Sequence, residues 1–417
     1  MTLPAARPTC ILVLQGGGAM GAYHIGAFQA LREGGFEPDW VCGISMGAIN
    51  GAIIAGNVAE RRLERLEAFW AAISRPPVIP AFGGTRLRTW EHNLSFATTL
   101  LEGQPGFFKP RAVNPYFAPP GVEATSFYDT APLFETLSET VDFDHLNERT
   151  ATRLSVGATD VETGMLDFFD TRKMSGRFGP EHVVASGSLP PGFPATRVGD
   201  RLYWDGGCVS NSPLEAVLDD IPSGHSIAFV INLWSAQGPA PETMEDVLWR
   251  AKRIQYASRT TQHVDWLATR INLRHALQLL EHTGAAPPDQ RLDLVHIMYH
   301  PEEDQIPSSD AEFSRASIAE RRSAGLSDMR RTLAAKPWSR VQKPSHVCCM
   351  VHRVTRDGIN TVDSDLWRYR TEPEMNDAPR PPHAETRKMT DDAALDPSDV
   401  PWRSGRAPFE RESAPTR

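Results

Sequence analysis

Two segments near the N-terminus, Cys10–Glu33 (CILVLQGGGAMGAYHIGAFQALRE) and Trp40–Ala55 (WVCGISMGAINGAIIA), decide the fold class. In each segment a short apolar run enters a glycine-rich turn, and small and apolar residues at helical spacing follow. A continuous apolar run is typical of a strand buried on both faces of a sheet. Alternating strands and helices predict a three-layer α/β/α fold with a mainly parallel central sheet.

Composition supports a globular protein and excludes several classes. Hydrophobic residues make up 41% of the 417 residues, and the formal net charge of −9 argues against a nucleic-acid partner. No run reaches the roughly 18–20 apolar residues of a membrane span, and the N-terminus does not have the pattern of a signal peptide. We expect a cytoplasmic protein, with peripheral membrane contact and a homo-oligomer as further expectations. The five cysteines are too few and too scattered for a disulfide framework: Cys10, Cys42, Cys208, Cys348 and Cys349.

The rest of the chain is predicted to add a hairpin, further strands and a helical extension. The predicted elements are a hairpin over 153–161 and 165–169, a helix over 180–186, a strand over 227–233, two or more helices over 244–280, a strand over 292–299 and a helix over 313–333. We divide the chain into a catalytic domain over 8–235, a mostly helical extension over 236–356 and a disordered tail over 357–417. An aromatic-rich insertion over about 76–128 has two interpretations, a lid or a local satellite core.

Ser45 is the candidate nucleophile, because Gly43-Ile44-Ser45-Met46-Gly47 lies between a predicted strand and a predicted helix. In a nucleophile elbow the turn is so tight that the flanking positions must be small, and the serine hydroxyl projects clear of the backbone. The start of the helix also favours developing negative charge. The short pattern alone also occurs by chance, so the assignment depends on its position between a predicted strand and a predicted helix.

The cluster Gly16-Gly17-Gly18 follows the first strand, and it allows two interpretations. Exposed backbone amides suit an oxyanion hole, but Gly16-x-Gly18-x-x-Gly21 also spells a dinucleotide-binding fingerprint. A dinucleotide site requires an acidic residue at the end of the second strand, whereas Asp39 precedes that strand. Carboxyl ends of parallel strands share one edge, so the glycines and Ser45 are expected together, which favours acyl transfer.

Asp205 is the candidate general base. It follows the predicted strand 201–204 and precedes Gly206 and Gly207, which allow close approach to another loop. An Asp-Gly pair alone is more often an ordinary turn, so the assignment depends on proximity to Ser45.

These motifs resemble those of the patatin-like phospholipase family, including bacterial members with a helical C-terminal extension. The similarity covers about residues 8–235, with the motifs in the family's order. The matching pieces are Leu14–Tyr23 (LQGGGAMGAY), Gly43–Asn57 (GISMGAINGAIIAGN), Ala185–Phe193 (ASGSLPPGF) and Trp204–Pro213 (WDGGCVSNSP).

The resemblance implies a serine acyl hydrolase that cleaves carboxyl esters of lipids and needs no metal or cofactor. Ser45 and Asp205 would then form a catalytic dyad without histidine. The oxyanion hole would use the amides of Gly16, Gly17, Gly18 and Met46, and the supporting motif glycines are Gly21, Gly43, Gly47, Gly206 and Gly207. The chain departs from the family at Met20, where many members have arginine, so a cation near the hole is missing.

Three alternatives remain at this point. A Ser-His-Asp triad is one, because His225, His263, His275, His282 and His296 all follow Asp205. A metal site at His296 and His300, or at His346 and His352, is the second, although no third ligand has a recognisable spacing. The third is a non-catalytic nucleotide- or lipid-binding module that uses the glycine loop.

Overall fold

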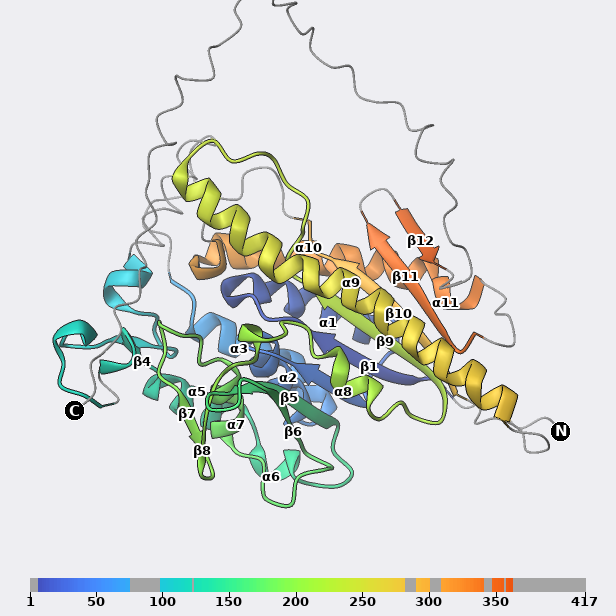
Figure 1. The fold of residues 1–417 in the computed structure, drawn as a ribbon, viewed down its shortest axis with the longest axis horizontal. Coiled ribbons are helices and arrows are strands. Elements are labelled where there is room, and N and C mark those ends of the chain that lie inside the picture. The colour runs from blue at the N-terminus through green and yellow to red at the C-terminus, as the bar shows by residue number, and fades with distance from the viewer. Residues whose placement is uncertain are drawn as a thin grey trace, which may run out of the picture. The chain divides into compact units, whose positions relative to one another are not determined.

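The structure is a computed structural model that describes residues 7–75, 98–121, 124–281, 290–300, 309–340, 347–355 and 358–362. Figure 1 shows the arrangement of its strands and helices. The first half contains β1 (Thr9–Leu14), η1 (Gly18–Ala22), α1 (Tyr23–Glu33), β2 (Trp40–Gly43), α2 (Met46–Ala55), η2 (Ala59–Arg61), α3 (Arg62–Ala72), β3 (Lys109–Pro110), η3 (Pro115–Phe117), β4 (Tyr128–Asp129), α5 (Ala131–Thr140), α6 (Phe143–Leu146), β5 (Arg153–Asp160), β6 (Leu166–Asp170) and α7 (Pro180–Ser186). The second half contains β7 (Thr196–Val198), β8 (Arg201–Asp205), η5 (Gly206–Cys208), α8 (Leu214–Leu218), β9 (Gly224–Asn232), α9 (Met244–Glu281), β10 (Gln290–Met298), η6 (Ser309–Ala311), α10 (Arg315–Ala335), α11 (Pro337–Arg340), β11 (Cys349–Thr355) and β12 (Gly358–Val362).

A ten-stranded mixed sheet organises these elements, in the order β12-β11-β10-β9-β1-β2-β5-β8-β7, with β6 also paired to β5. The strands from β11 through β5 in this order run parallel. Strands β12, β6, β8 and β7 each pair antiparallel with a neighbour. The carboxyl ends of β1 and β2 therefore meet at one edge, as expected for the glycine loop and Ser45.

Helices cover both faces of the sheet, which confirms the predicted three-layer class. Successive side chains of a strand point to opposite faces. Leu12 and Leu14 accordingly belong to a hydrophobic cluster shared with α1, α2 and α10. Ile11 and Val13 belong to a second cluster, shared with α8 and α9. Both sides of β1 are thus buried, which explains its uninterrupted apolar sequence.

The predicted C-terminal extension contributes strands as well as helices. Residues 244–281 form one helix, α9, rather than two or more, because no proline or glycine interrupts the segment. Strands β10, β11 and β12 continue the main sheet from β9. Strand β12 uses the first residues of the segment that we predicted as a disordered tail, and residues 363–417 lie outside the described residues.

Helix α10 packs closely against α1 because glycines face each other at the crossing. A Cβ atom at Gly26 would lie 1.8 Å from the Arg322 carbonyl oxygen, and one at Gly325 would lie 2.1 Å from the Tyr23 carbonyl oxygen. Larger residues at either position would separate the helices. The extension is therefore packed directly on the N-terminal helix that follows the glycine loop.

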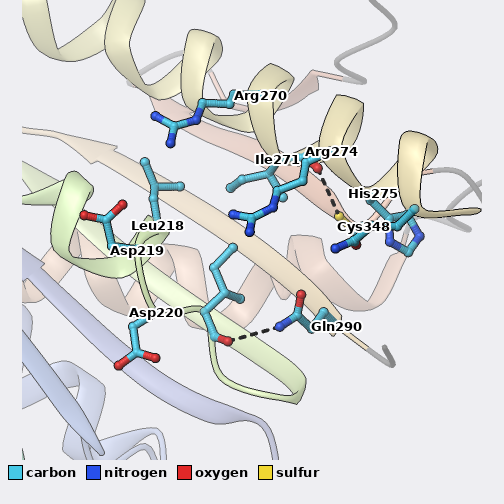
Figure 2. A pocket seen from close by; sticks show the side chains of 11 residues that line it. Leu218, Asp219, Asp220, Arg270, Ile271, Arg274, His275, Gln290 and Cys348 are labelled. Atoms are coloured by element: carbon cyan, nitrogen blue, oxygen red, sulfur yellow. Dashed lines mark hydrogen bonds between the residues drawn. The ribbon is translucent and has the colours of Figure 1, made fainter. Parts of the chain in front are cut away.

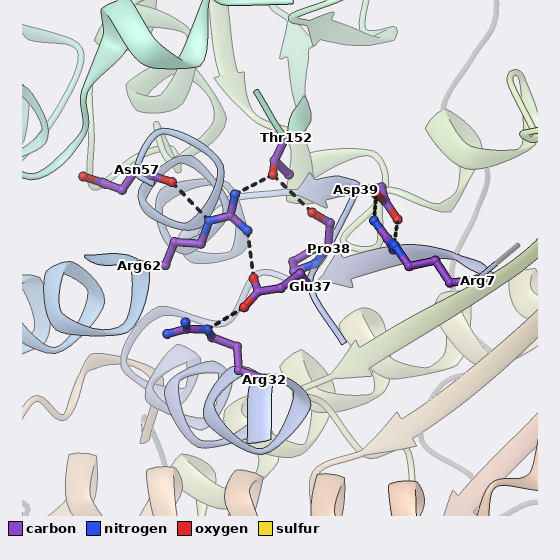
Figure 3. A network of polar contacts seen from close by, with 8 residues as sticks. All are labelled: Arg7, Arg32, Glu37, Pro38, Asp39, Asn57, Arg62 and Thr152. Atoms are coloured by element: carbon purple, nitrogen blue, oxygen red, sulfur yellow. Dashed lines mark hydrogen bonds and ion pairs between the residues drawn. The ribbon is translucent and has the colours of Figure 1, made fainter. Parts of the chain in front are cut away.

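A polar network surrounds the start of β2 (Figure 3). The buried guanidinium of Arg62 donates to Glu37 at 3.0 Å and to Thr152 at 2.7 Å. Asp39 accepts from Arg7 at 2.6 and 2.8 Å and from the Cys10 amide at 2.9 Å. Asp39 thus has a structural role at the amino end of β2, away from the edge where a nucleotide ribose would bind.

The aromatic insertion divides into buried and exposed parts, and residues 76–97 and 122–123 lie outside the described residues. Phe107 and Phe108 are buried against Phe193, with ring centroids 6.0 and 5.1 Å away. Tyr116 and Phe117 are more than four-fifths exposed. The first pair belongs to the main hydrophobic cluster rather than to a separate satellite core. The second pair is exposed, and Tyr116 contacts Phe127, with ring centroids 6.1 Å apart.

Candidate active site

The tight turn at Ser45 connects β2 to α2. Ser45 has φ +56° and ψ −126°, a backbone conformation that non-glycine residues rarely adopt and that costs roughly 1–3 kcal/mol. Its flanking glycines leave no room for side chains. A Cβ atom at Gly47 would lie 2.1 Å from the Leu14 carbonyl oxygen, and one at Gly43 would lie 2.3 Å from the Gly47 carbonyl oxygen. These contacts explain the Gly-x-Ser-x-Gly spacing.

A second serine holds this turn. The backbone amide of Ser45 donates to the Ser186 hydroxyl oxygen at 2.9 Å. The Ser186 hydroxyl donates in turn to the Gly157 carbonyl oxygen at 2.6 Å. Ser186 is the last residue of α7 and is fully buried. The elbow is therefore fastened to β5 and α7 as well as to its own strand.

Asp205 ends β8 and is 2% exposed. Its Oδ1 accepts a hydrogen bond from the Gly207 amide at 2.7 Å. Burial raises the pKa of Asp205 from its ordinary value of 3.8 to about 6, although hydrogen bonds from the Gly207 amide and the Ser45 side chain act in the opposite direction. Such a carboxylate is deprotonated at neutral pH and is still a stronger base than an exposed aspartate.

The glycine loop is fixed by side chains from outside it. The Gly16 carbonyl oxygen accepts hydrogen bonds from Asn211 Nδ2 at 2.9 Å and from Trp234 Nε1 at 2.8 Å. The Gly16 amide donates to the Asn211 carbonyl oxygen at 3.3 Å. This amide is already engaged, in contrast to the expectation that it belongs to the oxyanion hole.

The remaining candidate amides of the hole have no acceptor among the described residues: those of Gly17, Gly18 and Met46. Met46 is the first residue of α2, where helix geometry leaves the backbone amide without an intrahelical partner. Gly21 allows the loop to approach α2, because a Cβ atom there would lie 2.4 Å from Met46 Cγ. Met20 is buried beneath Gly17.

A narrow cleft of about 30 Å³ brings Ser45, Asp205 and the glycine loop together, whereas Met46 is not among the residues that line it. Its lining residues are Gly16, Gly17, Gly18, Ser45, Leu189, Asp205, Gly207, Asn211, Trp234, Lys252, Tyr256 and Asp310. A nucleophile, a carboxylate and unpaired amides thus share one small volume. The arrangement is chemically suited to attack on a carbonyl carbon and to stabilisation of the resulting oxyanion.

None of the histidines in the described part of the chain lines this cleft. His225 and His352 both contact the buried Asp293 at 2.8 Å. His296 lies fully buried in β10, and burial lowers its pKa to about 3. The other candidates lie elsewhere: His263 near Glu215, His275 at a second pocket, and His282 outside the described residues.

The metal alternative has little geometric support in the described residues. His300 Nδ1 lies 3.0 Å from the Met298 carbonyl oxygen, and His346 is outside the described residues. No group of three or more His, Cys, Asp or Glu side chains within that part of the chain is arranged to hold a metal ion.

A second, larger pocket of about 310 Å³ lies between α9 and the segment after α8 (Figure 2). Arg270, Arg274 and His275 of α9 line one side, and Asp219 and Asp220 line the other. Asp220 is already paired with Arg153 at 2.6 Å. The lining residues include none of the candidate catalytic groups.

Comparison with models of known protein families identifies the family of this chain. The sequence model described as patatin-like phospholipase matches residues 12–218, and one described as patatin phospholipase matches residues 280–345. The chain belongs to the patatin-like phospholipase family. This membership extends over the glycine loop, the elbow and the Asp-Gly-Gly motif, and the second match places part of the C-terminal extension within the family as well.

The curated relatives match this chain over a short stretch, which is 5% or less of their own length. Human patatin-like phospholipase domain-containing protein 6 is 43% identical over 63 residues, which is 15% of this chain and 5% of that protein. Neuropathy target esterase sws of Drosophila melanogaster is 55% identical over 42 residues, which is 10% of this chain and 3% of that protein. The crystal structure of VipD from Legionella pneumophila aligns with 79% of this chain and 67% of its own at 14% identity and a TM-score of 0.35.

Sequence reasoning missed several residues of the cleft. Ser186 lies within the quoted motif Ala185–Phe193, so its position signalled importance but its hydrogen bonds did not. Trp234, Lys252 and Asp310 carry no local motif, because they reach the cleft from distant parts of the chain. Only the folded arrangement brings them to the glycine loop.

Proposed function

We propose that this member of the family is a serine acyl hydrolase that cleaves carboxyl esters of lipids. The observation that carries the proposal is that Ser45 and the buried Asp205 line one narrow cleft with Gly17 and Gly18, whose amides have no acceptor among the described residues. Phospholipase A or lysophospholipase action fits this assignment. Ser45 is the nucleophile, Asp205 the base, and the amides of Gly17, Gly18 and Met46 the oxyanion hole.

The reaction follows from this geometry. Asp205 accepts the Ser45 proton as the hydroxyl oxygen attacks the ester carbonyl carbon. The free amides hold the tetrahedral oxyanion, and each such donor contributes about 2.7–4 kcal/mol in other hydrolases. Collapse expels the alcohol, which takes the proton from Asp205. Water then attacks the acyl-enzyme with Asp205 again acting as base.

Two observations favour this dyad over the alternatives. None of the described histidines lies at the cleft, so a triad has no candidate third member there. Asp39 is occupied by Arg7 and by the Cys10 amide at the opposite end of β2, which weighs against a dinucleotide site. A purely binding function would also not require the strained backbone at Ser45.

A serine-directed fluorophosphonate probe tests the enzyme assignment. We expect labelling of the full chain and its loss in Ser45→Ala, together with loss of p-nitrophenyl butyrate hydrolysis. Ser210→Ala is the matched control, because Ser210 is a nearby serine whose hydroxyl bonds the Ser212 carbonyl oxygen. A folded chain that neither labels nor hydrolyses the ester would instead indicate the binding module.

We further propose peripheral contact with a lipid surface through α9. This helix carries an exposed apolar stripe at helical spacing, in addition to its buried face: Met244, Leu248, Trp266, Leu273, Leu277 and Leu280. Arg270 stacks near Trp266, with the guanidinium carbon 5.9 Å from the ring centroid. Exposed apolar and basic side chains together are typical of helices that lie in a membrane interface. The described residues contain no helix long and apolar enough to cross a membrane.

Vesicle sedimentation tests this contact. We expect the chain to sediment with phosphatidylcholine–phosphatidylglycerol vesicles, and the double variant Leu277→Ser/Leu280→Ser to remain largely in the supernatant. Met165→Ser is the control, since Met165 is equally exposed but lies in the turn between β5 and β6. Equal sedimentation of all three proteins would contradict the role of α9. A homo-oligomer, expected from the sequence analysis, stays a prediction.

A further inference from the structure

An ion pair is part of the lining of the catalytic cleft. Lys252 of α9 contacts Asp310 of η6, with Nζ 2.5 Å from Oδ2, and both residues line the cleft with Ser45 and Asp205. Lys252 is the one positively charged side chain among the described residues that line it. The other charged groups there are the two carboxylates, Asp205 and Asp310.

Both members of the pair are held in place. Arg321 is buried and donates to the carbonyl oxygens of Ser309 and Glu312 at 2.9 Å, which fixes the short helix that carries Asp310. The Asp310 carbonyl oxygen also lies against the glycine loop, since a Cβ atom at Gly18 would be 2.2 Å from it. The C-terminal part of the chain therefore places this pair directly beside the oxyanion hole.

Lys252 is supported by the aromatic residues next to it. Its Nζ lies 5.9 Å from the ring centroid of Trp234, the residue whose indole nitrogen holds the Gly16 carbonyl oxygen. Tyr256, one turn further along α9, packs against the same indole, with 5.0 Å between ring centroids. The ammonium group thus lies near the indole that holds the glycine loop as well as beside its carboxylate partner.

The pair is partly exposed, with 36% of the Lys252 side chain and 16% of the Asp310 side chain accessible. An ion pair of this exposure contributes little to stability. The two side chains line a cleft of small volume. Its 30 Å³ leave room for about two water molecules. An ester with an acyl chain needs more room than this, and Lys252 and Asp310 are two of the side chains that line the cleft.

We propose that Lys252 binds the phosphate group of a phospholipid substrate, and that Asp310 occupies this position when no substrate is bound. The inference rests on the proposed hydrolase function and adds the residue that recognises the phosphate group of the substrate. A lysine ammonium is a common point-charge partner for phosphate. Exchange of one anionic partner for another keeps the lysine charge compensated, and it opens the cleft at the same time. Without Lys252, a phosphate would face only the carboxylates of Asp205 and Asp310.

The test compares two substrates that differ only in the phosphate-containing headgroup. Dihexanoylphosphatidylglycerol and dihexanoylglycerol share acyl chains and ester bonds and are used below their aggregation limits. For Lys252→Met we expect kcat/KM on the phospholipid to fall at least 10-fold more than kcat/KM on the neutral glyceride, because one charge-assisted hydrogen bond is lost. Lys252→Arg should recover part of this preference.

Removal of the competing carboxylate should act in the opposite direction. In Asp310→Asn we expect a lower KM for the phospholipid and an increased preference over the glyceride. Inorganic phosphate is then added to the wild type. Competitive inhibition of phospholipid hydrolysis at low millimolar phosphate would indicate recognition of a free anion. No inhibition at this concentration would indicate recognition of a lipid-bound phosphate. Lys173→Met is the control with no expected change, because Lys173 pairs with Asp220 outside the cleft.

An equal loss on both substrates in Lys252→Met, or no loss on either, would overturn the inference and leave the hydrolase function intact. Circular dichroism melting of each variant separates this result from misfolding. Failure of the proposed function has a different signature, since the wild type would then hydrolyse neither substrate, or Ser45→Ala would retain hydrolysis of both.

Discussion

The Ser186 side chain links the Ser45 backbone to a neighbouring strand. Its hydroxyl oxygen accepts from the Ser45 amide at 2.9 Å, and its proton goes to the Gly157 carbonyl oxygen at 2.6 Å. Ser45 has a positive φ, so its conformation persists only if the surroundings hold it. The hydroxyl of Ser186 supplies part of that constraint from a helix that is distant in sequence.

We expect Ser186→Ala to lower both stability and activity. The change leaves the Ser45 amide and the Gly157 carbonyl group buried without this partner, which costs about 1–3 kcal/mol. Relaxation of the elbow moves the nucleophile, and small displacements of reacting groups lower kcat by roughly 10-fold to 100-fold. Urea unfolding and ester hydrolysis measure the two effects.

Ser188→Ala is the matched control for this role. Ser188 is equally buried and donates to the Val184 carbonyl oxygen at 2.9 Å, but its side chain does not contact the elbow. We expect a similar loss of stability with kcat nearly preserved. If both variants lost activity in proportion to stability, Ser186 would have no specific effect on the nucleophile.

The pKa of Asp205 predicts the pH dependence of the reaction. Only the carboxylate accepts the Ser45 proton, and burial raises the pKa of Asp205 to about 6. We therefore expect kcat/KM for p-nitrophenyl butyrate to rise with pH, with a midpoint near 6, and to level off above about pH 7. A midpoint near 4, the ordinary value for an exposed aspartate, would show that burial does not govern this group.

The same shift predicts how stability changes with pH. The folded chain binds the Asp205 proton more tightly than the unfolded chain does, so the contribution of this residue to stability is present below about pH 4 and falls as pH rises to about 6. The difference between a pKa of 3.8 and one of about 6 corresponds to about 3 kcal/mol of stability lost at neutral pH. Asp205→Asn removes this penalty, so we expect the variant to be inactive but more stable than the wild type at pH 7.5, with little difference at pH 4. Equal stability of the two proteins at both pH values would contradict the assignment.

The fold and much of the cleft followed from local patterns in the sequence. Cys10–Leu14 is apolar at every position because both faces of β1 are buried, and the helix over Pro180–Ser186 starts at its proline as expected. The glycine loop and Ser45 meet because parallel strands share an edge. These features depend on neighbours in sequence or on sheet geometry, and both are readable without coordinates.

The other features depend on packing between distant segments. The engaged amide of Gly16 follows from the position of Asn211, which no spacing rule specifies. The position of Lys252 follows from the way α9 crosses the sheet face, and the position of Asp310 follows from the anchoring of η6 by Arg321. A sequence pattern identifies an amphipathic helix, but it does not indicate which neighbouring loop its charged side chains will reach.

A pair of glycine substitutions separates loop geometry from general backbone strain. Gly18 and Gly35 both have positive φ, at +52° and +80°. Alanine at either position costs about 1–2 kcal/mol in backbone strain. Only Gly18→Ala adds a clash, because its Cβ would lie 2.2 Å from the Asp310 carbonyl oxygen, whereas Gly35 has nothing within 4 Å. The clash displaces the loop that holds the Gly17 and Gly18 amides, so we expect kcat to fall roughly 10²–10³-fold in Gly18→Ala.

Gly35→Ala is the control: we expect it to lose stability but to keep its kcat. Full activity in Gly18→Ala, measured on protein that melts cooperatively, would place the oxyanion hole elsewhere.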